Sequence, residues 1–181
     1  MSVQGWWLGS ICALSSVLGC GEPPAPVAPT DPIVEPPSDA PVRSFAYQRI
    51  DGAMVTAKSY RGRMTLIVMV TTYDTASQAQ AQFVEALVHR YVPRMNALLL
   101  VLEPPQNAPL VEAYAGGLGL SYDVAMADAD TVAGNGPFPG LHHVPSVVLL
   151  DRESREVWRH VGIVETAPLE AAIREHDERA R

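Results

Sequence analysis

The sequence predicts an α/β domain built on a mixed β-sheet with helices on both faces, and three observations lead to this fold class. Residues 64–70 and 97–102 are continuous apolar runs, which is typical of parallel strands buried on both faces. Residues 76–91 lie between them, carry apolar side chains at helical spacing and are stopped by Pro93. A strand, a helix and a second buried strand in this order form the central unit of an α/β fold.

Shorter elements extend this unit at both ends. Asp51-Gly52 separates residues 45–50 from 54–57, a pattern that predicts a β-hairpin before the central sheet. The elements expected after the second buried strand are a short helix at 110–115 ended by Gly116-Gly117, a strand at 123–127, a loop at 128–143, paired strands at 147–150 and 156–161, and a closing helix around 169–176.

The N-terminus predicts export and a lipid anchor. Residues 1–20 contain no Asp, Glu, Lys or Arg, and their apolar centre has the length of a signal peptide rather than of a membrane span. Val17-Leu18-Gly19-Cys20 resembles the bacterial lipoprotein processing box, so residues 1–20 are predicted to be a lipoprotein signal and Cys20 the lipidation site. The alternative is an ordinary secretory signal in which Cys20 has no role. Gly21 follows the cysteine, which by resemblance to bacterial sorting rules favours the outer membrane.

The next segment has the composition of a tether. Residues 21–43 carry eight of the 16 prolines, so they cannot bury a core and are predicted to be a proline-rich linker. Residues 44–181 have the length of one compact domain. We therefore expect one domain held in the cell envelope, lipid-anchored and facing the periplasm.

Charge and cysteine content exclude several functions. Residues 44–181 carry 12 Lys and Arg against 16 Asp and Glu without a basic stripe, so neither nucleic acid nor a lipid surface is an expected partner of the domain, and membrane attachment depends on the lipid alone. Cys12 and Cys20 both precede the domain, which therefore has no thiol for redox chemistry or for a soft metal. We expect no cofactor.

Several short motifs carry a family resemblance. Gly52, Tyr60-Arg61-Gly62-Arg63, Val144-Pro145-Ser146, Leu149-Leu150-Asp151-Arg152 and Gly162 occur in an order and at spacings that resemble the TlpA-like and redoxin branch of the thioredoxin superfamily, over residues 45–176. The resemblance implies a thioredoxin-like fold with an N-terminal hairpin extension. It also implies a cis peptide bond between Val144 and Pro145 at the active site, and thiol-disulfide exchange as the activity of the family.

The reactive site departs from the family pattern. Relatives have Cys-x-x-Cys directly after the first central strand, and the matching positions here are Asp74 and Ser77. A carboxylate cannot attack a disulfide, and an ordinary serine hydroxyl cannot form one. We therefore predict no catalytic residues at this site, and an enzyme only in the sense of family descent.

Three interpretations of the altered site remain. In the first, Asp74 or Thr75 caps the following helix. In the second, Tyr73, Asp74 and Thr75 form a groove with Val144 and Pro145, where relatives dock an extended polypeptide, which predicts a protein or peptide partner.

The third interpretation is metal binding. It rests on His142 and His143, with Asp128 and Asp130, in a loop expected near the same groove. Copper-delivering Sco-type relatives of this fold hold their metal with two cysteines and a histidine, and without thiolates such a site loses its best ligands, so no metal is predicted. The alternative function is that of an oxidoreductase-family or Sco-like accessory protein in envelope redox or metal handling, whose partner supplies the thiols.

Overall fold

The structure, a computed structural model, describes residues 40–179. The predicted signal, Cys20 and all but the last four residues of the predicted linker lie outside the described residues. No helix within residues 40–179 is long and apolar enough to cross a membrane.

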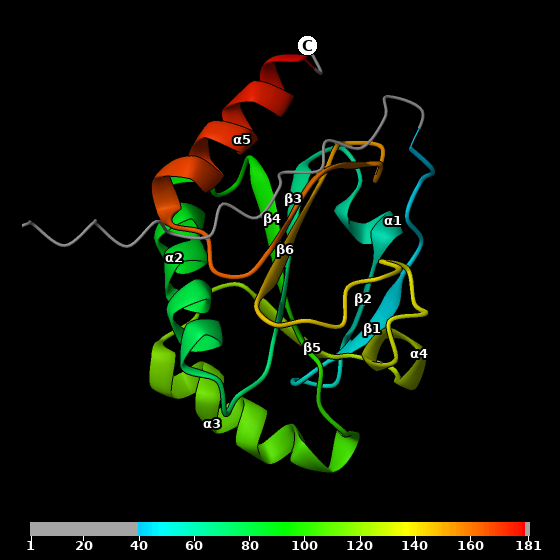
Figure 1. Cartoon of the computed structure of the whole chain (residues 1–181), viewed down its shortest axis with the longest axis vertical. Coiled ribbons are helices and arrows are strands. Elements are labelled where there is room, and N and C mark those ends of the chain that lie inside the picture. The colour runs from blue at the N-terminus through cyan, green and yellow to red at the C-terminus, as the bar shows by residue number, and fades with distance from the viewer. Residues whose placement is uncertain (1–39, 180–181) are drawn as a thin grey trace, which may run out of the picture. The chain divides into compact units, whose positions relative to one another are not determined.

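One mixed β-sheet of seven strands forms the centre of the described part, in the order β2-β1-β5-β4-β3-β6-β7 (Figure 1). Three neighbouring strands run parallel: β5 (Asp123–Met126), β4 (Met95–Val101) and β3 (Met64–Val70). On one side, β6 (Ser146–Leu150) and β7 (Glu156–Val161) continue the sheet antiparallel. On the other side it ends in the hairpin of β1 (Ala46–Arg49) and β2 (Met54–Thr56), antiparallel to β5.

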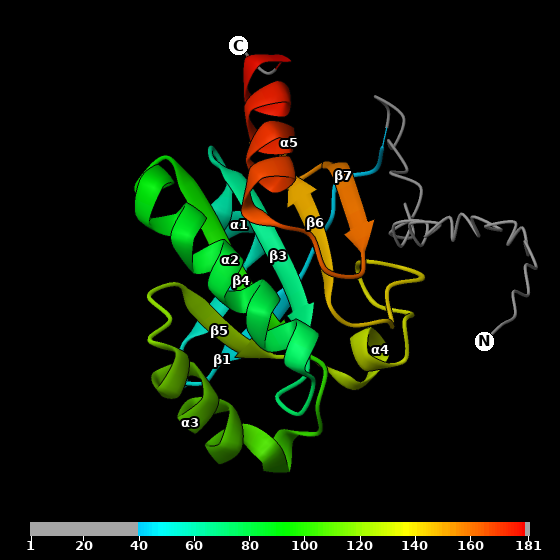
Figure 2. The ribbon, with the colours of Figure 1, turned by 60° about the vertical axis from the view of Figure 1, so that its left-hand side comes forward.

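Helices cover both faces of the sheet, as Figures 1 and 2 show. One face packs against α2 (Thr75–Tyr91), α3 (Ala108–Leu118) and α5 (Thr166–Arg179), around a core that includes Leu66, Leu87 and Leu169. The other face is covered by the short helix α1 (Ala57–Tyr60) and the segment that contains α4 (Ala129–Val132), around Phe45, Phe138 and Leu141. All seven residues of β3 are buried, as its unbroken apolar sequence predicts.

The predicted fold class is confirmed, and three local predictions are wrong. Residue 57 begins α1 instead of ending a strand, because Thr56 and Ser59 form a reciprocal capping box. Helix α3 runs through Gly116-Gly117 and ends where Gly119 adopts a left-handed conformation at φ 64°. The predicted loop at 128–143 contains α4, a single turn too short to show a period, which Asp128 caps by accepting a hydrogen bond from the Thr131 amide at 2.8 Å.

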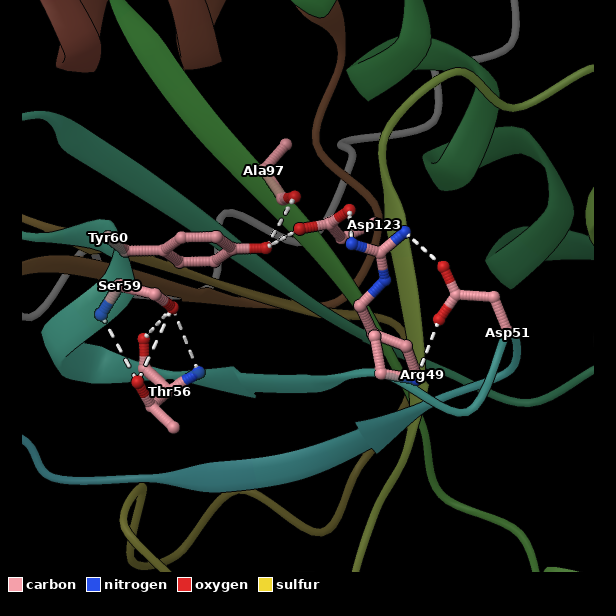
Figure 3. A network of polar contacts seen from close by, with 8 residues as sticks. Arg49, Asp51, Thr56, Ser59, Tyr60, Ala97 and Asp123 are labelled. Atoms are coloured by element: carbon pink, nitrogen blue, oxygen red, sulfur yellow. Dashed lines mark hydrogen bonds and ion pairs between the residues drawn. The ribbon is translucent and has the colours of Figure 1, made fainter.

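A polar network fastens the hairpin to the amino ends of β4 and β5 (Figure 3). The Tyr60 hydroxyl donates to the Asp123 carboxylate, whose other oxygen lies 3.0 Å from the Arg49 guanidinium. Arg49 also pairs with Asp51 of the turn at 2.6 Å. Burial and the hydrogen bond to Asp123 raise the pKa of Tyr60 far above its usual value, so the phenol stays protonated and remains a donor.

Residues 40–43, assigned to the linker by their composition, contact the turn between β6 and β7. Val42 forms an antiparallel bridge with Arg155, and the Arg43 amide donates to the Ser154 carbonyl at 2.8 Å. The Arg43 guanidinium lies 2.8 Å from Glu156, a carboxylate that is 1 % exposed. The segment that leads into the domain is therefore bonded to the start of the edge strand β7.

Candidate functional site

The predicted groove residues lie at one end of the sheet, on two adjacent loops. Strands β3 and β6 are paired as far as Met69 opposite Ser146, so the loop after β3 and the loop before β6 leave the sheet side by side. Tyr73, on the first loop, is 80 % exposed. On the second loop Val144 is half-buried, Pro145 is buried, and the peptide bond between them is cis. The structure therefore brings the two halves of the predicted groove to the same end of the sheet.

Asp74 caps α2, and Thr75 is the first residue of that helix. The Asp74 Oδ2 atom accepts hydrogen bonds from the Ser77 amide and from the Ser77 hydroxyl, both at 2.7 Å. The hydroxyl bond is the main cause of a lowered Asp74 pKa, and the amides of Ser77 and Ala76 add to it against the opposing effect of burial. Asp74 is therefore ionised at neutral pH, and the capping interpretation is confirmed for this residue.

The sequence analysis missed Glu103, which holds the β3–α2 loop in place. It follows β4, is 2 % exposed, and accepts hydrogen bonds from the Thr72 amide at 2.5 Å and the Asn107 side chain at 2.8 Å. Burial alone would raise the pKa of Glu103, but these hydrogen bonds outweigh burial and lower it, so the carboxylate is charged. Its position directly after a buried parallel strand was the available signal, because such positions meet at the carboxyl edge of a sheet.

Two hydroxyls near these carboxylates, Thr71 Oγ1 and Tyr114 Oη, are buried without a hydrogen-bond partner in the described part, while the Thr72 side chain bonds to Glu103. The Tyr114 side chain comes from α3. Burial, together with the charges of Asp74 and Glu103, raises the pKa of Tyr114 to about 12, so this phenol is neutral and can donate. Buried polar atoms without a partner are uncommon in folded proteins. This end of the sheet therefore holds unused hydrogen-bonding capacity beside two carboxylates.

The segment that follows β7 completes this end of the sheet. The Gly162 amide donates to the Pro145 carbonyl at 2.8 Å, and the Val164 amide donates to Gln80 Oε1 of α2 at 2.7 Å. Ile163 between them is 47 % exposed. Ile163 and Val164 also line a cavity of about 500 Å³ between β7 and α5, whose other lining residues include Trp158 and Pro168.

The candidate metal-ligating residues do not form a metal site in the described part of the chain. The His142 and His143 rings lie 4.4 Å apart between centroids, and both side chains are exposed. Asp128 is used as the cap of α4. Within residues 40–179 no three His, Cys, Asp or Glu side chains are placed to hold a metal ion together.

Sheet order and helix placement define a thioredoxin-like fold. A DsbF homologue from Corynebacterium diphtheriae has a similar structure with a TM-score of 0.70, at 12 % sequence identity, over 82 % of this chain and 96 % of that one. A putative thiol:disulfide interchange protein DsbE from Chlorobium tepidum matches with a TM-score of 0.63 at 14 % identity, over 76 % and 96 % of the two chains.

A third similar structure is a secreted Mycobacterium tuberculosis disulfide oxidoreductase homologous to E. coli DsbE. It matches with a TM-score of 0.59 at 11 % identity, over 72 % of this chain and 95 % of that one. No family model and no curated protein matches the sequence. The similarity therefore establishes the thioredoxin-like fold.

Proposed function

We propose that this protein is an envelope-tethered thioredoxin-like domain that has lost dithiol chemistry and binds an extended polypeptide segment at the cis-proline end of its sheet. The observation that carries the proposal is the replacement of the redox pair: Asp74 and Ser77 are bonded to each other at the start of α2, while the loop opposite retains a cis Pro145. Tyr73, on the loop beside Asp74, is exposed, and residues 40–179 contain no cysteine.

The loss of redox function follows from the composition of residues 40–179, which contain no cysteine. Neither a carboxylate nor a serine hydroxyl can exchange with a disulfide. We expect the purified chain to reduce insulin disulfides no faster than buffer containing the same reductant. Turnover that depends on the chain would contradict this part of the proposal.

Polypeptide binding is tested by site-specific photo-crosslinking in cells. Tyr73 is replaced by a photoreactive benzoyl-phenylalanine, which its 80 % exposure should accommodate. We expect covalent protein adducts on illumination because an extended partner would pass within reach of this ring. Met54, 59 % exposed on β2, is the matched control position and should give none. Equal adducts at both positions, or none at Tyr73, would argue against a groove at the cis-proline end.

The tether rests on Cys20 and on the proline-rich composition of residues 21–43. Cys20→Ala should move the protein from the membrane fraction to the soluble fraction, because no other lipidation site is expected. Fractionation after a high-salt wash measures this, with Cys12→Ala as the matched control that should stay membrane-bound. A Cys20→Ala protein that remains in the membrane fraction would place the anchor elsewhere.

A further inference from the structure

The end of the sheet that carries the candidate site lacks fixed positive charge. Lysine and arginine are absent from residues 64–89, 95–151 and 160–173. These stretches supply the loop after β3, the loop after β4, the loop before β6 and the segment after β7. The carboxylates at this end are Asp74, Glu103, Asp128, Asp130 and Glu165. Arg159, on β7, is already bonded to Glu156 and to the Pro139 carbonyl.

At the opposite end of the sheet, basic side chains accompany the carboxylates. Arginines there are paired with carboxylates, at 3.0 Å for Arg49 with Asp123, 3.0 Å for Arg90 with Glu170, and 2.7 Å for Arg152 with Asp177. By contrast, no ion pair within residues 40–179 involves Asp74 or Glu103. The loops at the candidate site therefore carry carboxylates with no lysine or arginine in the same stretches of sequence.

Glu103 keeps its negative charge at neutral pH. A carboxylate that is 2 % exposed would ordinarily take up a proton or pair with a cation, yet two hydrogen bonds keep it ionised. A buried charge acts through a medium of lower dielectric constant than water, so its field at the nearby surface is screened less than that of an exposed carboxylate. Asp74, which is partly exposed and whose charge also acts on Tyr114, adds a second charge that a partner can contact.

Exposed apolar side chains and a cavity lie on segments at the same end of the sheet. Tyr73 and Ile163 are exposed, and the cavity of about 500 Å³ begins at Ile163 and Val164. The Val164 amide is held by Gln80, a fully buried residue of α2, which fixes the cavity relative to the start of that helix. An extended chain crossing this end would meet carboxylates first and an apolar cavity next.

We propose, resting on the function proposed above, that the partner is an extended segment of another protein that combines basic and apolar side chains. Its lysine or arginine side chains lie against Asp74 near the buried Glu103, its backbone meets the unpartnered Tyr114 hydroxyl, and an apolar side chain enters the cavity beside Ile163. Complementary charge accelerates association and selects against acidic segments.

Fluorescence anisotropy of labelled peptides tests this on the full chain. The probe is a short peptide of alternating lysine and leucine, compared with alternating glutamate and leucine and with alternating lysine and serine. We expect only the lysine–leucine peptide to bind well, and its affinity to fall as salt is raised. Asp74→Asn keeps the helix cap but removes the charge, and should weaken binding about two- to fivefold, the range typical of a partly exposed ion pair.

Matched variants separate the site from the rest of the surface. Glu153→Gln removes an exposed carboxylate at the opposite end of the sheet and should leave binding unchanged, whereas Ile163→Ser should weaken it and Met54→Ser should not. If the glutamate–leucine peptide binds more tightly than the lysine–leucine peptide, and Ile163→Ser weakens its binding, the charge preference is wrong. Polypeptide binding at this end of the sheet would still be supported. If the affinity for the lysine–leucine peptide is unchanged in both Asp74→Asn and Ile163→Ser, the proposed site is wrong. No peptide binding, combined with no Tyr73 adducts in cells, would overturn the proposed function as well.

Discussion

Asp74→Cys combined with Ser77→Cys is expected to restore a reversible disulfide. The two side chains already meet, since the Ser77 hydroxyl lies 2.7 Å from Asp74 Oδ2 at the first turn of α2. A thiol at position 74 would stand at the helix N-terminus, where the dipole lowers its pKa, and the buried position 77 would resolve it. The loss of the Asp74 cap should cost about 1 kcal/mol of stability.

The measurement is the fraction of maleimide-reactive thiol at equilibrium in glutathione buffers, in a chain whose Cys12 and Cys20 are replaced by Ser. Thr75→Cys with Ser77→Cys is the matched control, because residues two apart on a helix do not face each other. A correctly folded Asp74→Cys/Ser77→Cys variant that stays reduced in oxidising buffer would show that the loop no longer has the geometry of a dithiol site.

The second large effect is expected at Glu103. Glu103→Gln keeps the shape of the side chain, but its carbonyl can accept from only one of the two donors, the Thr72 amide or the Asn107 side chain. An unsatisfied buried group costs about 1–3 kcal/mol, so the free energy of unfolding should fall by that amount at pH 7. Glu112→Gln, at an exposed position of α3, is the control and should leave the free energy of unfolding unchanged.

The same carboxylate gives the stability a defined dependence on pH. Because the folded-state pKa of Glu103 is lowered from 4.5, its contribution is fully present above that value and is lost as the pH falls through the folded-state pKa, where the unfolded chain binds more protons. Denaturant unfolding should therefore show that the free energy of unfolding falls more steeply between neutral and acidic pH for the wild type than for Glu103→Gln. If the free energy of unfolding depends on pH in the same way for both proteins, the fold does not keep Glu103 ionised.

The sequence by itself determined the fold class, because the elements that define it are buried on both faces or strictly periodic. Strands β3 and β7 match their predicted bounds, and α2 begins one residue earlier than predicted. Apolar runs and helical spacing are local signals, so they can be read without knowing what packs against them. The sequence likewise shows that no cysteine follows Cys20.

Tertiary structure decided everything that depends on one segment meeting another. The role of Glu103 appears only when β4 lies beside the loop that carries Thr72, 31 residues earlier in the chain. The single turns α1 and α4 are set by side-chain caps within three residues, too short for any period to reveal. Carboxylates without basic neighbours gather at one end because Arg61 and Arg63 lie before β3, and Arg90 and Arg94 lie at and after the end of α2. The fold carries all four arginines to the opposite end of the sheet, an arrangement that depends on tertiary structure.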